Sequence, residues 1–219
     1  MIDAIIPVWK PVGWTSFDVV KKIRNQIKPA KVGHAGTLDP FAEGVLMICT
    51  GKFTKKVESF MDREKEYSAE IQLGIETNTL DTTGDIIKTA DVPDLSEMQI
   101  KKVIKKFIGD IKQEPPMFSA LKVDGQRLYK AARKGINVPR KKRVVSIYDI
   151  HLTHFTNNTI TLAVTCGRGT YIRSLGKDIA EALHTIGHLA TLKRTRIGEY
   201  DIKNCIDLKD FPQWISART

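Results

Sequence analysis

Two segments of the chain combine glycines with residues whose side chains could do chemistry. The first runs from Gly33 to Gly44 and contains His34, Asp39 and Pro40. Its glycines let the backbone approach a ligand closely, and Pro40 keeps Asp39 out of helical geometry, so its carboxylate lies in an extended or turn conformation. An ionised carboxylate there could act as a nucleophile or as a general base. Aspartate before proline also forms ordinary turns, and the local sequence leaves that alternative open.

The second segment, residues 167–175, places Arg173 in the first turn of an expected helix. A cation at that end of a helix opposes the helix dipole, at a cost of about 0.3 to 1 kcal/mol. A carboxylate partner would offset this cost, and an arginine exposed to solvent is the alternative.

Two other kinds of site fail on spacing. Gly51-Lys52 lacks the phosphate-binding loop pattern, because Leu46 stands where that loop needs glycine and Phe53 where it needs Ser or Thr. The five histidines and three cysteines form no compact ligand set, so we expect no metal site. The cysteines are odd in number and far apart, which favours free thiols in a reducing cytoplasm.

The charge of the chain favours a polyanionic partner. Its 35 Lys and Arg against 25 Asp and Glu give a net charge of +10. One cluster lies between residues 130 and 143 and a second near residues 193–196, a distribution typical of nucleic-acid binding, although a solvated face is the alternative for either cluster alone. No apolar run reaches the roughly 18 residues of a membrane span, and no secretory signal is visible, so we expect a cytoplasmic protein.

Periodicity predicts the elements that must position these residues. Thr15-x-x-Asp18 and Ser96-x-x-Gln99 resemble capping boxes, which predicts helices over residues 15–28 and from Ser96 to about Ile108. Alternation from Tyr67 to Leu73 predicts a strand with Tyr67 facing inward. Further expected helices cover residues 53–61, 127–134 and 170–184, and further strands cover residues 45–49, 119–123, 144–154, 159–166 and 189–197.

These elements alternate without a regular strand and crossover-helix pattern, which predicts an α+β fold with a mixed, mostly antiparallel central sheet flanked by helices. No linker or repeat divides the chain. We therefore expect one domain over residues 1–219, with a basic insertion at about residues 112–143 that contains a tight turn at Asp124-Gly125.

The chain resembles the tRNA pseudouridine synthases of the B type, the TruB family. The resemblance covers residues 10 to about 200 and rests on six motifs in the family's order. They are Lys10-Pro11-x-Gly13-x-Thr15-Ser16, Gly33-His34-x-Gly36-x-Leu38-Asp39-Pro40-x-Ala42-x-Gly44, Lys65-x-Tyr67, Pro115-Pro116-x-x-Ser119-Ala120-x-Lys122, Gly169-Thr170-Tyr171-Ile172-Arg173 and Leu192-x-Arg194.

The resemblance implies a pseudouridine synthase fold and an isomerase that converts uridine to pseudouridine at position 55, in the T-loop of tRNA. It implies no redox cofactor and no metal. We also expect a monomer with no membrane association and no obligate protein partner. Bacterial members usually continue into a PUA-type domain after the segment matching Gly198-Glu199-Tyr200, and the sequence predicts that this domain is absent.

The same resemblance assigns roles to residues. Asp39 matches the catalytic aspartate, Arg173 the arginine that pairs with it, and Tyr67 the tyrosine that stacks on the target base. His34 matches the histidine that stacks where the everted uridine was, and Leu192 the apolar residue near the base. The matching substrate-binding positions also include Gly36, Leu38 and Lys65. The RNA-clamping insertion supplies Lys130, Arg133, Lys134, Arg140, Lys141, Lys142 and Arg143.

Several alternatives stay open. Tyr67 and Leu192 could be plain core residues, and His34 a structural loop histidine. Asp39 could add to the substrate or remove a ribose proton to give a glycal. Arg168 and Ala180 depart from the family's lysine and glycine. The protein could act on another RNA, or it could be a catalytically silent RNA-binding or chaperone module of the same fold.

Overall fold

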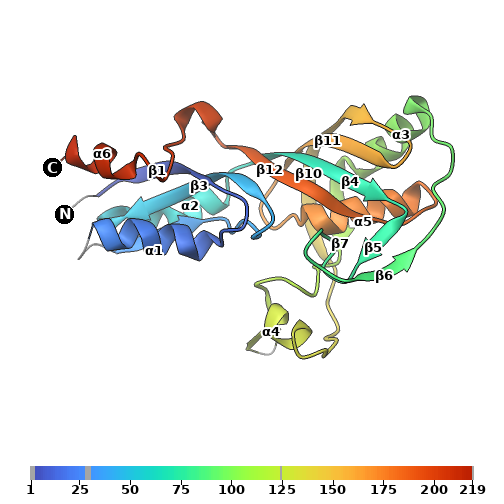
Figure 1. Ribbon diagram of the computed structural model, residues 1–219, viewed down its shortest axis with the longest axis horizontal. Coiled ribbons are helices and arrows are strands. Elements are labelled where there is room, and N and C mark those ends of the chain that lie inside the picture. The colour runs from blue at the N-terminus through green and yellow to red at the C-terminus, as the bar shows by residue number, and fades with distance from the viewer. Residues whose placement is uncertain (1–2, 28–30, 124, 219) are drawn as a thin grey trace. The chain divides into compact units, whose positions relative to one another are not determined.

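The computed structural model describes residues 3–27, 31–123 and 125–218, and it divides the chain into two compact units (Figure 1). The first unit consists of residues 1–68 and 192–219, and the second of residues 69–191. The boundaries fall inside strands β4 (Lys65–Leu73) and β12 (Gly187–Ile197), so each unit contains part of both strands.

The first unit is built on a sheet with the strand order β1-β3-β12-β4. β1 (Ile5–Lys10) runs antiparallel to β3 (Glu43–Thr50), and β2 (Val32–Ala35) is also antiparallel to β3, whereas β12 pairs with β3 in parallel. The other elements are α1 (Ser16–Gln26), α2 (Val57–Met61), α6 (Phe211–Ser216), β13 (Tyr200–Asp201) and the 3₁₀ helices η1 (Gly51–Lys56) and η3 (Ile202–Asn204).

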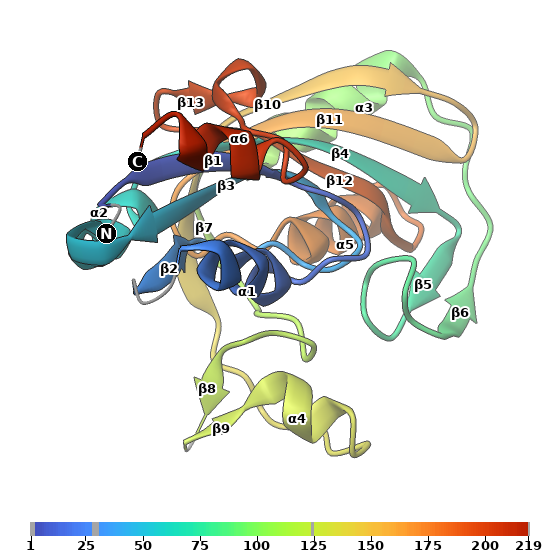
Figure 2. The same ribbon diagram turned by 60° about the vertical axis from the view of Figure 1, so that its left-hand side comes forward.

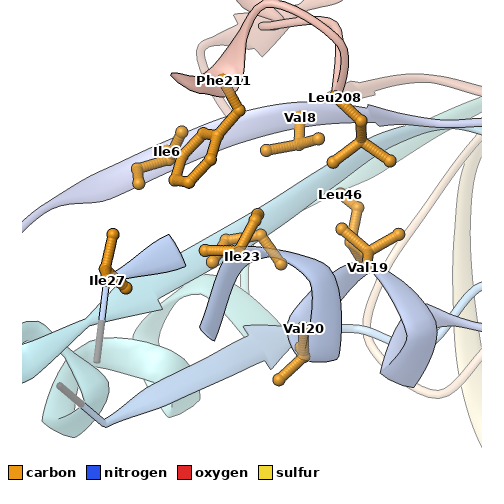
Figure 3. Packing of buried hydrophobic residues seen from close by; sticks show 10 residues of the cluster. Ile6, Val8, Val19, Val20, Ile23, Ile27, Leu46, Leu208 and Phe211 are labelled. Carbon is orange, nitrogen blue, oxygen red and sulfur yellow. The ribbon is translucent and has the colours of Figure 1, made fainter. Parts of the chain in front are cut away.

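Helix α1 begins where the sequence predicts. Thr15 caps it by accepting from the amide of Asp18, and the Asp18 carboxylate accepts from the Thr15 amide, which completes a capping box. Its buried positions recur at helical spacing and face the core of the first unit, where the side chains of Ile6, Ile23 and Phe211 point toward one another (Figure 3).

The second unit has a sheet with the strand order β12-β4-β11-β10-β7, in which β10 (Arg143–Phe155) runs antiparallel to both β7 (Gly109–Gln113) and β11 (Thr159–Cys166). Gly176 of helix α5 (Ile172–Ala182) lies directly against Ile71 of β4 and Leu189 of β12. The remaining elements are α3 (Glu97–Ile104), η2 (Lys105–Phe107) and a hairpin of β5 (Ile75–Thr77) and β6 (Ile86–Thr89).

The insertion forms a small lobe of the second unit between β7 and β10 (Figure 2). It contains β8 (Lys122–Val123), β9 (Gln126–Arg127) and α4 (Leu128–Ala132). The strand predicted over residues 119–123 is wrong except at its last two residues. The carbonyls of Ser119 and Leu121 instead accept from the amides of Tyr129 and Leu128 at the start of α4. Asp124 of the predicted turn lies outside the described residues.

Other element boundaries also differ from the prediction, and of the helix predicted over residues 53–61 only α2 is an α-helix, because η1 continues to Lys56. Arg127 lies in β9, so α4 is shorter than the helix predicted over residues 127–134. Helix α3 ends at Ile104, and Ile108, expected to face the core, is 42% exposed. The backbone turns at Gly109, whose φ of +104° favours glycine, and β7 begins there.

The α+β prediction is confirmed, because antiparallel pairings dominate a sheet that also contains the parallel β3–β12 pair. None of the helices formed by the described residues is long and apolar enough to cross a membrane.

We expect Ile23→Ala to lower the free energy of unfolding by about 2 to 5 kcal/mol, because it opens a cavity beside Ile6 and Phe211. Urea denaturation checks this. Phe17→Ala is the control in the same helix, since Phe17 is 59% exposed. It should change the stability by less than about 0.5 kcal/mol. Equal effects of the two variants would contradict the assignment of this core.

Candidate active site

Asp39 lies in a half-buried turn between β2 and β3 of the first unit. Its carbonyl accepts from the amide of Ala42 at 3.1 Å, and the carbonyl of Pro40 accepts from the amide of Gly13 at 2.8 Å. The predicted turn is therefore present, and the segment after β1 supports it. The side chain is near enough to Lys10 for the two charges to interact.

Two cations are buried close to this turn. Lys10 is 0% exposed and donates from Nζ to the carbonyls of Pro11 at 2.9 Å and Trp14 at 2.6 Å. Burial lowers the pKa of Lys10 to about 8, opposed by the charge of Asp39. The amine is thus largely protonated at neutral pH, and its charge favours a negative Asp39.

Arg194 is the second buried cation, at 1% exposure on β12. It donates from Nε to the carbonyl of Val45 at 2.7 Å and from Nη2 to the carbonyl of Gly36 at 2.9 Å. Both Lys10 and Arg194 lie in the motifs of the sequence, but Lys10 was given no role and Arg194 was counted only in the basic cluster near residues 193–196. Each occupies a buried position in the alternating burial of its strand, and in β1 Lys10 is the one charged residue.

His34 lies on β2 opposite Ile48 and is half-buried. Burial and the charge of Arg194 lower its pKa below the ordinary value of 6.5, so the ring is neutral at neutral pH. Its Nδ1 atom is buried and has no hydrogen-bond partner among the described residues. A neutral, partly open imidazole at this place can stack on a base.

Gly36 and Lys65 lie together in the first unit. Gly36 has a φ of +75°, and a Cβ there would lie 3.4 Å from Nη1 of Arg194 and 4.0 Å from Cε of Lys65. Lys65 is 5% exposed and donates from Nζ to the backbone carbonyls of Met61 and Arg63. The lysine expected to bind substrate therefore also supports the turn between α2 and β4.

Tyr67 and Leu192 occupy buried positions on β4 and β12, which are neighbours in the sheet of the first unit. The inward direction predicted for Tyr67 is confirmed by the alternating burial of β4. Leu38, in the turn itself, is also buried. These positions suit both a core role and an apolar wall for a base, so the roles of Tyr67 and Leu192 stay predictions.

Arg173 lies in the first turn of α5 in the second unit, and the alternative of an exposed arginine is wrong, because it is 3% exposed. Its Nη1 atom lies 3.2 Å from the Asp81 carboxylate and donates to the carbonyl of Thr79 at 2.8 Å. Its Nη2 atom donates to the carbonyl of Phe118 at 2.8 Å. A buried guanidinium with these partners has a fixed direction.

Asp81 is the carboxylate partner that sequence reasoning missed. It is 3% exposed and accepts from the hydroxyl of Thr79 at 2.8 Å and the amide of Thr83 at 2.9 Å. In the sequence, Asp81 stands in a run of Asp and Thr before Gly84, a pattern typical of an ordinary turn, so nothing marked it as the partner of Arg173. Asp39 and Arg173 belong to different units, and their pairing stays a prediction.

The seven basic residues that the resemblance assigns to the insertion fall into two groups. Six of them are exposed, namely Lys130, Arg133, Lys134, Lys141, Lys142 and Arg143. Arg140 differs, because its side chain is 19% exposed, lies 2.7 Å from the Glu114 carboxylate and donates to the carbonyl of Pro115 at 3.2 Å. Arg140 thus joins the base of the insertion to the segment directly after β7, and its charge is already paired.

A pocket of about 590 Å³ lies between the insertion and α5. The charged residues of its lining balance, four against four. They are Lys112, Arg140, Lys142 and Lys177 against Glu76, Glu114, Asp178 and Glu181. Burial raises the pKa of Asp178 to about 6. A lining without excess positive charge does not favour a phosphate.

Comparison with known proteins gives the family. Residues 24–172 match a family model described as the N-terminal domain of TruB family pseudouridylate synthase, and residues 173–219 match one described as the C-terminal domain of tRNA pseudouridylate synthase B. The chain therefore belongs to the TruB family of pseudouridylate synthases.

Curated relatives agree. The chain is 45% identical over 215 residues to the tRNA pseudouridine synthase B of Phocaeicola vulgatus, covering 95% of this chain and 92% of the relative. It is 47% identical over 208 residues to the protein of the same name from Clostridium kluyveri, covering 95% of this chain and 72% of the relative.

Solved structures share the fold. A chain of a Cbf5-Nop10-Gar1 complex matches with a TM-score of 0.75 and 31% identity over 96% of this chain. A chain of an H/ACA RNP bound to a substrate RNA containing 2′-deoxyuridine matches with a TM-score of 0.72 and 28% identity over 98% of this chain. The present chain spans 54% and 55% of those two chains.

We expect His34 to titrate below pH 6.5, as measured by NMR of the histidine rings. The unfolded chain then binds a proton more readily than the folded one at this position, so the free energy of unfolding falls as the pH drops below 6.5. His34→Gln should remove this part of the pH dependence. A His34 pKa at or above the ordinary value would contradict the burial of the ring beside Arg194.

Proposed function

We propose that this protein isomerises uridine to pseudouridine in tRNA, at position 55 of the T-loop. The observation that carries the proposal is the half-buried Asp39 turn beside the buried cations Lys10 and Arg194, in a chain of the TruB family. Family membership gives the reaction class, and the turn supplies a carboxylate whose charge the neighbouring cations favour.

The reaction exchanges one bond for another. The bond between uracil N1 and ribose C1′ breaks, the base rotates, and C5 joins C1′ while a proton leaves C5 and N1 gains one. The Asp39 carboxylate either adds to the substrate or removes a ribose proton, and both routes require its ionised form. No electron transfer is involved, so the reaction needs no redox cofactor, and the proposal assigns no step to a metal. In this proposal Arg173 pairs with Asp39, and Tyr67 stacks on the target base.

The target base must leave its stack before the carboxylate can reach the sugar, at a cost of a few kcal/mol. A neutral His34 ring that stacks in the vacated place would offset part of that cost, since aromatic stacking contributes about 1 to 3 kcal/mol per base. Gly36, Leu38, Lys65 and Leu192 would shape the pocket for the everted nucleotide around the Asp39 turn.

The insertion would clamp the T-arm. Its six exposed cations can contact phosphates, which supplies affinity and rapid encounter, while the shape of the loop supplies selectivity. In the same proposal the chain acts as a monomer without an obligate protein partner, and residues 1–219 form one catalytic domain that carries the insertion. The three cysteines are free, which is consistent with a cytoplasmic location.

We expect Asp39→Asn to abolish pseudouridine formation and to leave the Kd for an unmodified T-arm stem-loop within about tenfold of wild type, because it removes the reacting group and few phosphate contacts. The assay detects a mass-silent change of one uridine. Asp85→Asn, at an exposed carboxylate of the second unit, is the matched control and should stay active.

Turnover retained by Asp39→Asn would contradict the mechanism. Wild-type protein that binds the stem-loop without forming pseudouridine would indicate the silent RNA-binding module. Wild-type activity on ribosomal RNA alone would indicate another substrate.

We expect the triple variant Lys130→Gln, Lys134→Gln, Lys141→Gln to weaken binding and flatten its salt dependence. The slope of log K against log salt should fall by up to about 0.9 for each phosphate that the protein no longer neutralises. Filter binding from low to moderate salt measures it. The control neutralises three exposed lysines of the same unit, Lys102, Lys105 and Lys106. The same slope for both triple variants would contradict the role of the insertion.

A further inference from the structure

Hydrogen bonds from residues outside the Asp39 turn fix its backbone at every second residue. The carbonyl of Gly36 accepts from Arg194 at 2.9 Å, Leu38 bonds with the hydroxyl of Ser16, and the carbonyl of Pro40 accepts from the amide of Gly13 at 2.8 Å. All of these residues belong to the first unit. Residues 36–42 lie between β2 and β3, outside both strands, so the hydrogen bonds of this turn come from such contacts.

Ser16 makes the two bonds next to Asp39. Its hydroxyl accepts from the amide of Leu38 at 2.9 Å and donates to the carbonyl of the same residue at 3.2 Å. Ser16 is 2% exposed and Leu38 is 3% exposed. A buried amide and carbonyl outside a strand require partners, and here one hydroxyl supplies both.

Ser16 is also well fixed itself. It is the first residue of α1, directly after the cap residue Thr15, and α1 is anchored in the core of the first unit through Val19 and Ile23. The position of the Asp39 turn is therefore tied to a helix that the core holds in place. The Thr15 hydroxyl bonds only to Asp18, within the cap, in the hydrogen bonds found among the described residues.

We propose that Ser16 is a positioning residue for the isomerisation, which fixes the Asp39 carboxylate through the backbone of Leu38. The inference rests on the proposed function. A reacting group displaced by about 1 Å can lose about 100-fold in rate, because the reacting atoms no longer meet in the productive geometry. Ser16 is buried and carries no charge, so we expect its effect to fall on turnover and not on RNA binding.

The test is Ser16→Ala, assayed by the single-turnover rate of pseudouridine formation with saturating enzyme and an unmodified T-arm stem-loop. We expect the rate to fall about 10- to 100-fold. The Kd for the same RNA should stay within about threefold of wild type, because the charges that bind phosphates are unchanged. Amide exchange at Leu38 should speed up, since its amide loses its acceptor.

Thr15→Ala is the matched control, because it removes the cap of the same helix without touching Leu38. We expect it to lower the melting temperature and to keep the single-turnover rate within about twofold of wild type. If Ser16→Ala does not fold, Ser16→Cys keeps the shape of the side chain and replaces the hydroxyl with a weaker donor and acceptor. Its rate should then lie below wild type at an unchanged Kd.

Two outcomes would contradict the role of Ser16 without contradicting the proposed function. One is a wild-type rate in the Ser16 variant, and the other is an equal loss of rate in the Thr15 and Ser16 variants, which would reflect reduced stability of α1. Wild-type protein that forms no pseudouridine would instead overturn the proposed function.

Discussion

The central interaction of the first unit is the attraction between the Asp39 carboxylate and the positive charge buried near its turn. Lys10 and Arg194 are almost completely removed from water, and their hydrogen bonds go to backbone carbonyls. Carbonyls satisfy the donors but do not neutralise the charges. A buried cation is costly without a negative partner nearby, so the arrangement favours an ionised Asp39. The residues that stabilise the turn thus also prepare its carboxylate for reaction.

The second unit also contains a buried cation that requires a negative partner, and it supplies that partner from its own residues. Arg173 is buried against a carboxylate, Asp81, whose remaining acceptor positions bind Thr79 and Thr83. The guanidinium also holds the carbonyl of Phe118, at the start of the insertion. Losing one partner of such a pair leaves an uncompensated buried charge, which typically costs about 3 to 5 kcal/mol. The direction of Arg173 is therefore set by its own unit.

Local patterns in the sequence predicted many of the regular elements but not strands β1, β2 and β7, and they left the long-range contacts unpredicted. Helix α1 and strands β4, β10 and β11 follow periodicity and capping, which are local properties. Residues 119–121 looked like a strand, but their carbonyls bind the start of α4, and no local pattern encodes that choice. Asp39 was found because proline and glycines mark its turn. Three contacts of the site join residues that are far apart in the chain. Ser16 bonds to Leu38, 22 residues away, and Asp81 pairs with Arg173, 92 residues away. Arg194 bonds to Gly36, 158 residues away.

The most direct test of the Asp39 mechanism is a crystal structure of the Asp39→Asn variant bound to an unmodified T-arm stem-loop. We expect one uridine turned out of the loop, with its ribose beside the side chain at position 39 and the ring of His34 in the space that the base vacated. A fully stacked loop, or a bound uridine whose ribose lies far from position 39, would contradict the mechanism.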